Sequence, residues 1–144
     1  MADLPRPIDV LPHRPPFLLI DELVELEPGA SATGLWHLAD QDFFAGHFPG
    51  RPTLPGVLML ESIAQVGVMA VLTDERFADK LPLFGGVDKA RFRRQAVPGE
   101  TLRVEIEMTR LGARAGKGSG RATVDGEVCC EADLLFVVVP AQAG

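Results

Sequence analysis

One histidine and one glutamate stand in the part of this sequence whose residue types best suit chemistry, residues 46–65. His47 lies in the run Gly-His-Phe-Pro-Gly, and Glu61 lies 14 positions later in a long apolar segment. Histidine and carboxylic acids are the side chains that most often move protons near neutral pH. A carboxylate surrounded by apolar neighbours loses hydration unless it is paired, and such carboxylates cluster at functional sites. The two residues predict acid–base catalysis; the alternatives are a structural histidine and a buried glutamate bonded to backbone or arginine.

The loop that carries His47 and leads to the apolar segment is rich in prolines and glycines, namely Gly46, Pro49, Gly50, Pro52, Pro55 and Gly56. Proline fixes one backbone angle and glycine permits angles that other residues avoid. This composition therefore indicates a loop of defined shape, although a plain strand-to-helix connection is an alternative.

Gly56 stands where the apolar helix should begin, directly after Pro55. A helix N-terminus presents unpaired N–H groups and the positive end of the helix dipole. Because Gly56 has no side chain, a substrate carbonyl can approach its N–H closely, which is the geometry of an oxyanion hole. Gln65 lies one turn after Glu61 on the same face and can hold it by a hydrogen bond. These parts suit proton abstraction next to a thioester carbonyl.

The apolar segment that must position these groups, residues 56–73, is typical of a helix that is apolar on all sides and therefore buried. It also has the length of a membrane span. Glu61 and Gln65 in its middle, and the lack of flanking basic residues, favour a core helix instead.

Alternating residue patterns and turn signals predict strands at residues 17–26, 31–38, 83–92, 101–109 and 127–139. Glycines alternate with polar residues at 116–121, which predicts either a strand closely approached by a bulky group or a glycine-rich loop. Asp125 and Gly126 predict a hairpin turn. We therefore expect an α+β fold, a single domain over residues 1–144 in which a curled antiparallel sheet of about five to six strands wraps around a long central helix.

The composition is that of a globular protein of 144 residues, with 47% hydrophobic and 24% charged residues. The net charge of -6 argues against nucleic-acid binding by the whole surface. Cys129 and Cys130 are adjacent in a predicted strand and point to opposite faces, so they are poor disulfide partners. The polar, proline-containing start lacks the pattern of a secretory leader, so we expect a cytoplasmic location.

Five motifs occur in order along nearly the whole chain. They are Leu-Pro-His-Arg-Pro-Pro-Phe-Leu-Leu-Ile-Asp at 11–21, Phe-Phe-Ala-Gly-His-Phe-Pro-Gly at 43–50, the run from Pro-Gly-Val-Leu to glutamine at 55–65, Phe-Gly-Gly-Val-Asp-Lys-Ala-Arg-Phe at 84–92 and Val-Pro-Gly-Glu at 97–100. Together they resemble the 3-hydroxyacyl-acyl-carrier-protein dehydratases of the FabZ type. The resemblance implies a hot-dog fold and a hydro-lyase of fatty-acid biosynthesis and lipid metabolism. Such a lyase converts (3R)-3-hydroxyacyl-acyl-carrier-protein to the trans-2-enoyl product without metal or organic cofactor.

The resemblance also implies the roles of the site residues. His47 and Glu61 act together from opposite subunits of a homodimer, and dimers in this family commonly assemble into hexamers as trimers of dimers. Gly56 supplies the backbone N–H for the thioester carbonyl, and Gln65 supports the glutamate. We expect His47 to remove a proton from C2 while Glu61, as the acid, assists loss of the C3 hydroxyl.

The partner that the resemblance implies is an acidic acyl carrier protein. A local basic cluster suits its docking and consists of Lys89, Arg91, Arg93 and Arg94. An ordinary solvated face with ion pairs is the alternative. We expect no nucleic-acid partner and no membrane insertion.

Two residues depart from the family pattern. Leu83 stands where many relatives have a tyrosine thought to gate the acyl tunnel, so any gating uses another residue, such as Phe84. Ser62 stands where relatives usually have alanine, and we assign it no role. Of the other histidines, we expect His13 to pack the N-terminal segment and His37 to lie at the surface or an interface.

Other hot-dog proteins provide the alternatives. A combined dehydratase and isomerase carries aspartate as the helix acid, so Glu61 argues against it, and an enoyl-CoA hydratase is a sister activity. A thioesterase usually places a different acid and lacks the histidine loop. A catalytically silent subunit is disfavoured because His47 and Glu61 are both present.

Overall fold

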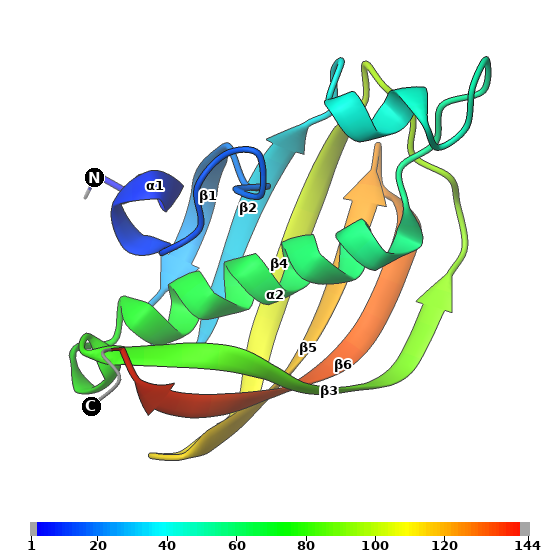
Figure 1. The fold of residues 1–144 in the computed structure, drawn as a ribbon. Coiled ribbons are helices and arrows are strands. Elements are labelled where there is room, and N and C mark those ends of the chain that lie inside the picture. The colour runs from blue at the N-terminus through cyan, green and yellow to red at the C-terminus, as the bar shows by residue number, and fades with distance from the viewer. Residues whose placement is uncertain (1–2, 142–144) are drawn as a thin grey trace.

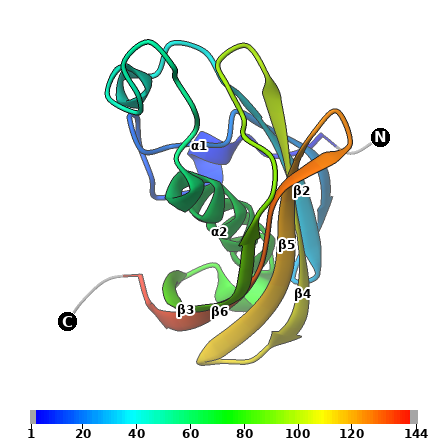
Figure 2. The same ribbon diagram turned by 90° about the vertical axis from the view of Figure 1, so that its right-hand side faces the viewer.

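One long helix, α2 (Gly56–Leu72), lies against one face of a six-stranded antiparallel sheet in a computed structural model that describes residues 3–141 (Figure 1). The strands are β1 (Glu22–Glu27), β2 (Ser31–His37), β3 (Lys80–Phe92), β4 (Thr101–Leu111), β5 (Ala115–Val124) and β6 (Glu127–Pro140). Their order across the sheet is β1-β2-β4-β5-β6-β3. The connections contain α1 (Pro7–Val10), η1 (Asp42–Ala45) and η2 (Glu75–Phe77). Seen from the side, the sheet curls around α2, which confirms the expected α+β arrangement (Figure 2).

The strand predictions fail mainly at the first strand. Residues 17–26 were expected to form it, but β1 begins only at Glu22. The preceding backbone bonds to a side chain of the helix instead: the Leu19 N–H donates to Gln65 Oε1 across 2.9 Å, and the Phe17 carbonyl accepts from Gln65 Nε2 across 2.8 Å. The continuous apolar run Phe-Leu-Leu-Ile at 17–20 is therefore compatible with a segment that covers the helix as well as with a strand.

The helix is buried because glycines allow it to lie close to the sheet. Every residue from Ser62 to Val71 is buried. A Cβ atom at Gly120 on β5 would collide with Ile63 of the helix, and one at Gly67 would lie 2.6 Å from the ring of Phe136. The prediction that a bulky group approaches the glycine face of this strand is confirmed, and the alternative of a glycine-rich loop is wrong.

β3 lies at one edge of the sheet and is 13 residues long. Four of its apolar side chains are between 43% and 54% exposed, and they are Leu83, Phe84, Val87 and Phe92. A long strand edge with exposed apolar side chains is a surface that suits pairing with another chain.

Two features complete the fold. Asp125 and Gly126 have φ values of 49° and 81° and join β5 to β6, which confirms the predicted hairpin. Cys129 and Cys130 are both buried free thiols. Within residues 3–141, no helix combines the length and the apolar character that crossing a lipid bilayer requires.

Candidate active site

Glu61 is held in place by Gln65, as the helical spacing predicts. The carboxylate is 18% exposed, and its Oε2 accepts a hydrogen bond from Gln65 Nε2 across 3.0 Å. The orientation of the Gln65 amide is set by the chain, because its Oε1 accepts from the Leu19 N–H and its Nε2 also donates to the Phe17 carbonyl. Both amide hydrogens are thus used. The Oε1 atom of Glu61 is the oxygen left to exchange a proton with a substrate.

His13 also faces Glu61, which the sequence did not predict. Its Nε2 lies 3.6 Å from Glu61 Oε2, and its ring stacks on Phe17 with 6.4 Å between the centroids. The prediction gave this histidine a packing role only. The spacing of the two residues in the sequence gives no hint of this contact. The only sequence feature that could have pointed to it is the place of His13 in the first motif.

His47 is fixed by Thr53, at the other end of its loop. Its Nδ1 lies 2.9 Å from the Thr53 carbonyl oxygen, and the Thr53 N–H donates back to the His47 carbonyl across 2.8 Å. Because a carbonyl only accepts, Nδ1 carries the hydrogen and Nε2 of the neutral ring is free to take up a proton. The ring also stacks on the exposed Phe48, with 4.2 Å between the centroids.

The two predicted catalytic residues, His47 and Glu61, bond to different parts of one chain. His47 bonds to its own loop, whereas Glu61 bonds to the helix and to the segment around Phe17. Within residues 3–141 no hydrogen bond or ion pair links His47 to Glu61. One chain therefore brings Glu61, Gln65 and His13 into contact, and His47 bonds to its own loop instead.

Gly56 opens α2 at the edge of a pocket. Pro55 is the N-cap residue, and its carbonyl accepts from the amides of Leu58 and Met59. A Cβ atom at Gly56 would lie 2.8 Å from the ring of Phe92, so glycine lets this exposed ring lie against the start of the helix. The pocket has a volume of about 380 Å³ and is lined by Thr53, Leu54, Gly56, Met59, Phe92, Arg93, Arg94 and Gln95. The first N–H groups of the helix thus border a space that can hold a small acyl group.

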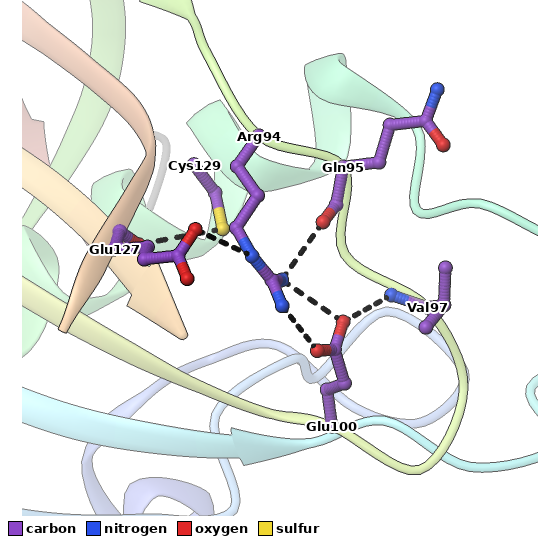
Figure 3. A network of polar contacts seen from close by, with 6 residues as sticks. All are labelled: Arg94, Gln95, Val97, Glu100, Glu127 and Cys129. Carbon is purple, nitrogen blue, oxygen red and sulfur yellow. Dashed lines mark hydrogen bonds and ion pairs between the residues drawn. The ribbon is translucent and has the colours of Figure 1, made fainter. Parts of the chain in front are cut away.

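Arg94, predicted to help dock a carrier protein, is the centre of an intramolecular network (Figure 3). Its guanidinium bonds to Glu100 at 2.7 and 3.1 Å and to the Gln95 carbonyl at 2.9 Å, and it lies 3.3 Å from Glu127. The hydrogen bond from Arg94 holds the pKa of the Glu100 carboxyl below its usual range, and the same bond raises the pKa of Arg94. Burial raises the pKa of the neighbouring Cys129 thiol. The network fixes the chain that forms one wall of the pocket.

The remaining docking candidates are more exposed. Arg93 pairs with Glu131, with 3.0 Å between Nε and Oε1. Arg91 is exposed and donates to the Ala90 carbonyl, and Lys89 is exposed with a positive φ of 54°. The docking role of the cluster stays a prediction.

Three other predicted positions have clear contacts. Phe84 is 43% exposed and stacks on Phe136, with 6.5 Å between the centroids. The buried Ser62 hydroxyl donates to the Met59 carbonyl, which satisfies it within the helix. His37 was predicted to lie at the surface or at an interface. It is exposed in one chain, and its ring nitrogens lie near Glu22 and Thr101. A gating role for Phe84 stays a prediction.

The described residues include no group of three His, Cys, Asp or Glu side chains placed to hold a metal ion.

Comparisons with known proteins agree on one family. The model of the FabA-like domain family matches residues 11–133. The chain is 52% identical over 130 residues to 3-hydroxyacyl-acyl-carrier-protein dehydratase FabZ of Clostridium botulinum (strain Kyoto / Type A2), covering 90% of each chain. It is 48% identical over 139 residues to the protein of the same name from Desulforamulus reducens, covering 96% of this chain and 98% of that one.

Solved structures show the same fold at low sequence identity. The dehydratase heterocomplex ApeI:P from Xenorhabdus doucetiae matches with a TM-score of 0.78 and 17% identity, covering 94% of this chain and 91% of that one. A mutant thioesterase from Pseudomonas aeruginosa matches with a TM-score of 0.64 and 18% identity, covering 83% and 81%. These likenesses support the hot-dog fold. The family model and the two relatives establish more than the fold: the chain belongs to the FabA-like family and, within it, to the FabZ-type 3-hydroxyacyl-acyl-carrier-protein dehydratases.

Proposed function

We propose that this protein dehydrates (3R)-3-hydroxyacyl-acyl-carrier-protein to trans-2-enoyl-acyl-carrier-protein in fatty-acid biosynthesis. The observation that carries the proposal is that Gln65 bonds to Oε2 of the mostly buried Glu61 and leaves Oε1 without a hydrogen bond among the described residues. That arrangement suits a carboxylic acid that must deliver one proton at a defined point. The names of the relatives supply the substrate class.

In the proposed mechanism His47 is the base. Its Nε2 removes a proton from C2 of the substrate, and the N–H of Gly56 stabilises the negative charge that develops on the thioester oxygen. Glu61 gives a proton from Oε1 to the C3 hydroxyl, which leaves as water while the C2–C3 double bond forms. The imidazolium and the carboxylate that remain return to their starting forms when the proton passes from His47 to Glu61.

We further propose that each site lies between two subunits, with His47 of one protomer facing the partner subunit's Glu61. In one chain His47 and Glu61 bond to different segments, which agrees with this arrangement, and the apolar edge of β3 suits pairing of two chains. A homodimer is then the smallest active unit, and a trimer of dimers is the larger assembly that we expect.

The carrier protein docks, in this proposal, on the basic cluster Lys89, Arg91, Arg93 and Arg94. Because the Arg94 side chain is only 29% exposed and is paired with Glu100, we assign it to shaping the docking surface. The other three side chains are exposed, and we assign them to contacting the acidic partner. Phe84 borders the acyl chain. A cytoplasmic location stays a prediction of the sequence.

The test is a product assay with 3-hydroxyacyl chains attached to acyl carrier protein. The expected product is the trans-2-enoyl thioester, and Glu61→Gln and His47→Ala should each lower its rate by about 100-fold or more. A cis-3-enoyl product would favour the isomerising relatives, and a free acid would favour a thioesterase. If either variant keeps a rate within threefold of the wild type, the acid–base assignment is wrong.

A further inference from the structure

The segment of residues 11–19, here called the N-terminal strap, lies over Glu61 and Gln65. Its end is bonded to the Gln65 side chain through the Leu19 N–H and the Phe17 carbonyl. Its beginning is held by Leu11, whose side chain is 2% exposed and packs in the hydrophobic core. Arg14 Nη1 donates to the carbonyls of Leu11 and His13 at 2.9 and 2.7 Å, which shapes the turn between them. His13 therefore projects from a segment that is anchored on both sides of it.

Between these anchors the His13 ring points one nitrogen at Glu61 and buries the other. Nε2 lies 3.6 Å from Glu61 Oε2, and the two side chains are 23% and 18% exposed. Nδ1 is buried and has no hydrogen-bond partner among the described residues. A buried polar atom without a partner destabilises a folded protein, so an apolar ring would suit the packing at this position better than an imidazole.

The two nitrogens have different environments, and this indicates the tautomer. A carboxylate oxygen accepts hydrogen bonds, so Nε2 is the nitrogen that carries the hydrogen, while Nδ1 presents only its lone pair. Glu61 Oε2 then faces two donors, Gln65 Nε2 at 3.0 Å and His13 Nε2 at 3.6 Å. Contacts around a catalytic group in a free enzyme are often long and tighten as charge develops during the reaction.

From this arrangement we propose that His13 is a positioning residue for Glu61: with Gln65 it holds Oε2 and orients Oε1 toward the substrate. The inference rests on the proposed function, in which Glu61 is the acid. When Glu61 gives up its proton, the new negative charge on the carboxylate is stabilised by the donors that face Oε2. His13 does not touch the substrate in this scheme.

Three substitutions distinguish the role of His13 as a hydrogen-bond donor from its role in packing against Phe17. His13→Phe keeps a flat ring against Phe17 but removes both nitrogens. His13→Gln places an amide N–H near the position of Nε2, whereas His13→Asn places its amide near Nδ1, where no partner lies. The rate and the substrate dependence of dehydration are measured for each variant, together with its melting temperature.

We expect His13→Phe to lower kcat by about 10- to 100-fold with KM within threefold of the wild type, because a misplaced acid affects the chemical step rather than binding. The same variant should melt about 2–4 °C higher, since it removes an unpaired buried nitrogen. His13→Gln should keep kcat within about fivefold of the wild type, and His13→Asn should not.

Two results would overturn the inference while leaving the proposed function standing. One is a His13→Phe enzyme with wild-type kcat in a preparation where Glu61→Gln is inactive. The other is an equal loss for His13→Phe and His13→Gln that follows their melting temperatures, because a purely structural histidine gives that pattern. A wild-type enzyme without dehydratase activity would instead refute the proposed function itself.

Discussion

The side-chain amide of Gln65 donates to the carboxylate of Glu61 across 3.0 Å, one helical turn away, while the rest of the amide is bonded to the backbone at Leu19 and Phe17. One fully buried glutamine thus connects the helix, the covering segment and the proposed acid. The orientation of Glu61 is therefore coupled to the docking of residues 11–19.

Replacing Gln65 with leucine should damage both stability and activity. The substitution leaves the buried Leu19 N–H and the part-buried Phe17 carbonyl without their partner, so we expect the free energy of unfolding to fall by about 2–4 kcal/mol. Loss of the donor to Glu61 should lower kcat roughly tenfold or more. Urea unfolding and steady-state rates measure the two effects. Gln95→Leu, at an exposed position, is the control and should change stability by less than about 0.5 kcal/mol.

Mixing two inactive variants tests whether the site spans two subunits. A heterodimer of His47→Ala and Glu61→Gln has one site with both residues intact only if they come from different chains. Random reassociation makes half of the dimers mixed, so activity should return to about a quarter of the wild-type rate. Activity that stays at the level of the separate variants, in a sample shown by mass spectrometry to contain heterodimers, would place both residues in one chain.

Gly120→Ala tests the close approach of the helix to β5. The new methyl group would meet the Ile63 side chain and lie 2.9 Å from the Glu105 carbonyl, and the strand backbone cannot easily move away. We expect a loss of about 1–3 kcal/mol in the free energy of unfolding. Gly112→Ala is the matched control, because its nearest neighbour would be 3.6 Å away at an exposed turn. Equal effects of the two substitutions would contradict the packing argument.

Most of the fold could be predicted from the sequence, because it depends on local patterns. The alternation of apolar and polar residues predicted β4, and the apolar residues on all sides of residues 56–73 predicted α2. Asp125 with Gly126 predicted the last hairpin. The predicted start of the first strand is wrong. The bonds that replace strand pairing there join Leu19 and Phe17 to Gln65, which lies 46 and 48 positions further along the chain. Contacts over such a distance along the chain leave no periodic pattern in the sequence from which they could be predicted.

The site was predictable only in part for the same reason. The spacing of Glu61 and Gln65 is helical, so their contact could be foreseen and is confirmed. The approach of His13 to Glu61 depends on how the N-terminal segment crosses the helix. The prediction that Arg94 helps dock a carrier protein rests on its charge alone. Charge does not indicate that Glu100 and Glu127 lie close enough to pair with it.

The Arg94–Glu100 pair should contribute stability that depends on pH. The folded protein lowers the pKa of Glu100 from its ordinary value of 4.5, chiefly through the hydrogen bond from Arg94. The contribution is therefore complete above the ordinary value and is lost as the pH falls through the lower folded value. Glu100→Gln should lower the free energy of unfolding by about 1–3 kcal/mol at pH 7. The difference from the wild type should shrink as the pH falls below about 4.

Urea titrations at several pH values measure this dependence, with Glu107→Gln at an exposed position of β4 as the control. A difference between the wild type and Glu100→Gln that is the same at pH 7 and at acid pH would mean that the pair does not titrate as described.

Charge reversal on β3 tests the docking surface. Lys89 and Arg91 are exposed in one chain, so Lys89→Glu with Arg91→Glu should leave the fold of the chain unchanged while repelling an acidic carrier protein. Because both residues lie on β3, whose edge is proposed to pair two chains, sedimentation must first show that the double variant is still a dimer. We expect KM for the carrier-bound substrate to rise about tenfold or more at low salt, and the effect to weaken as salt is added. KM for a short thioester without the carrier should stay within twofold. Arg114→Glu, in the exposed connection between β4 and β5, is the control and should change neither value. An equal rise in KM for both substrates would assign these residues to the acyl site rather than to docking.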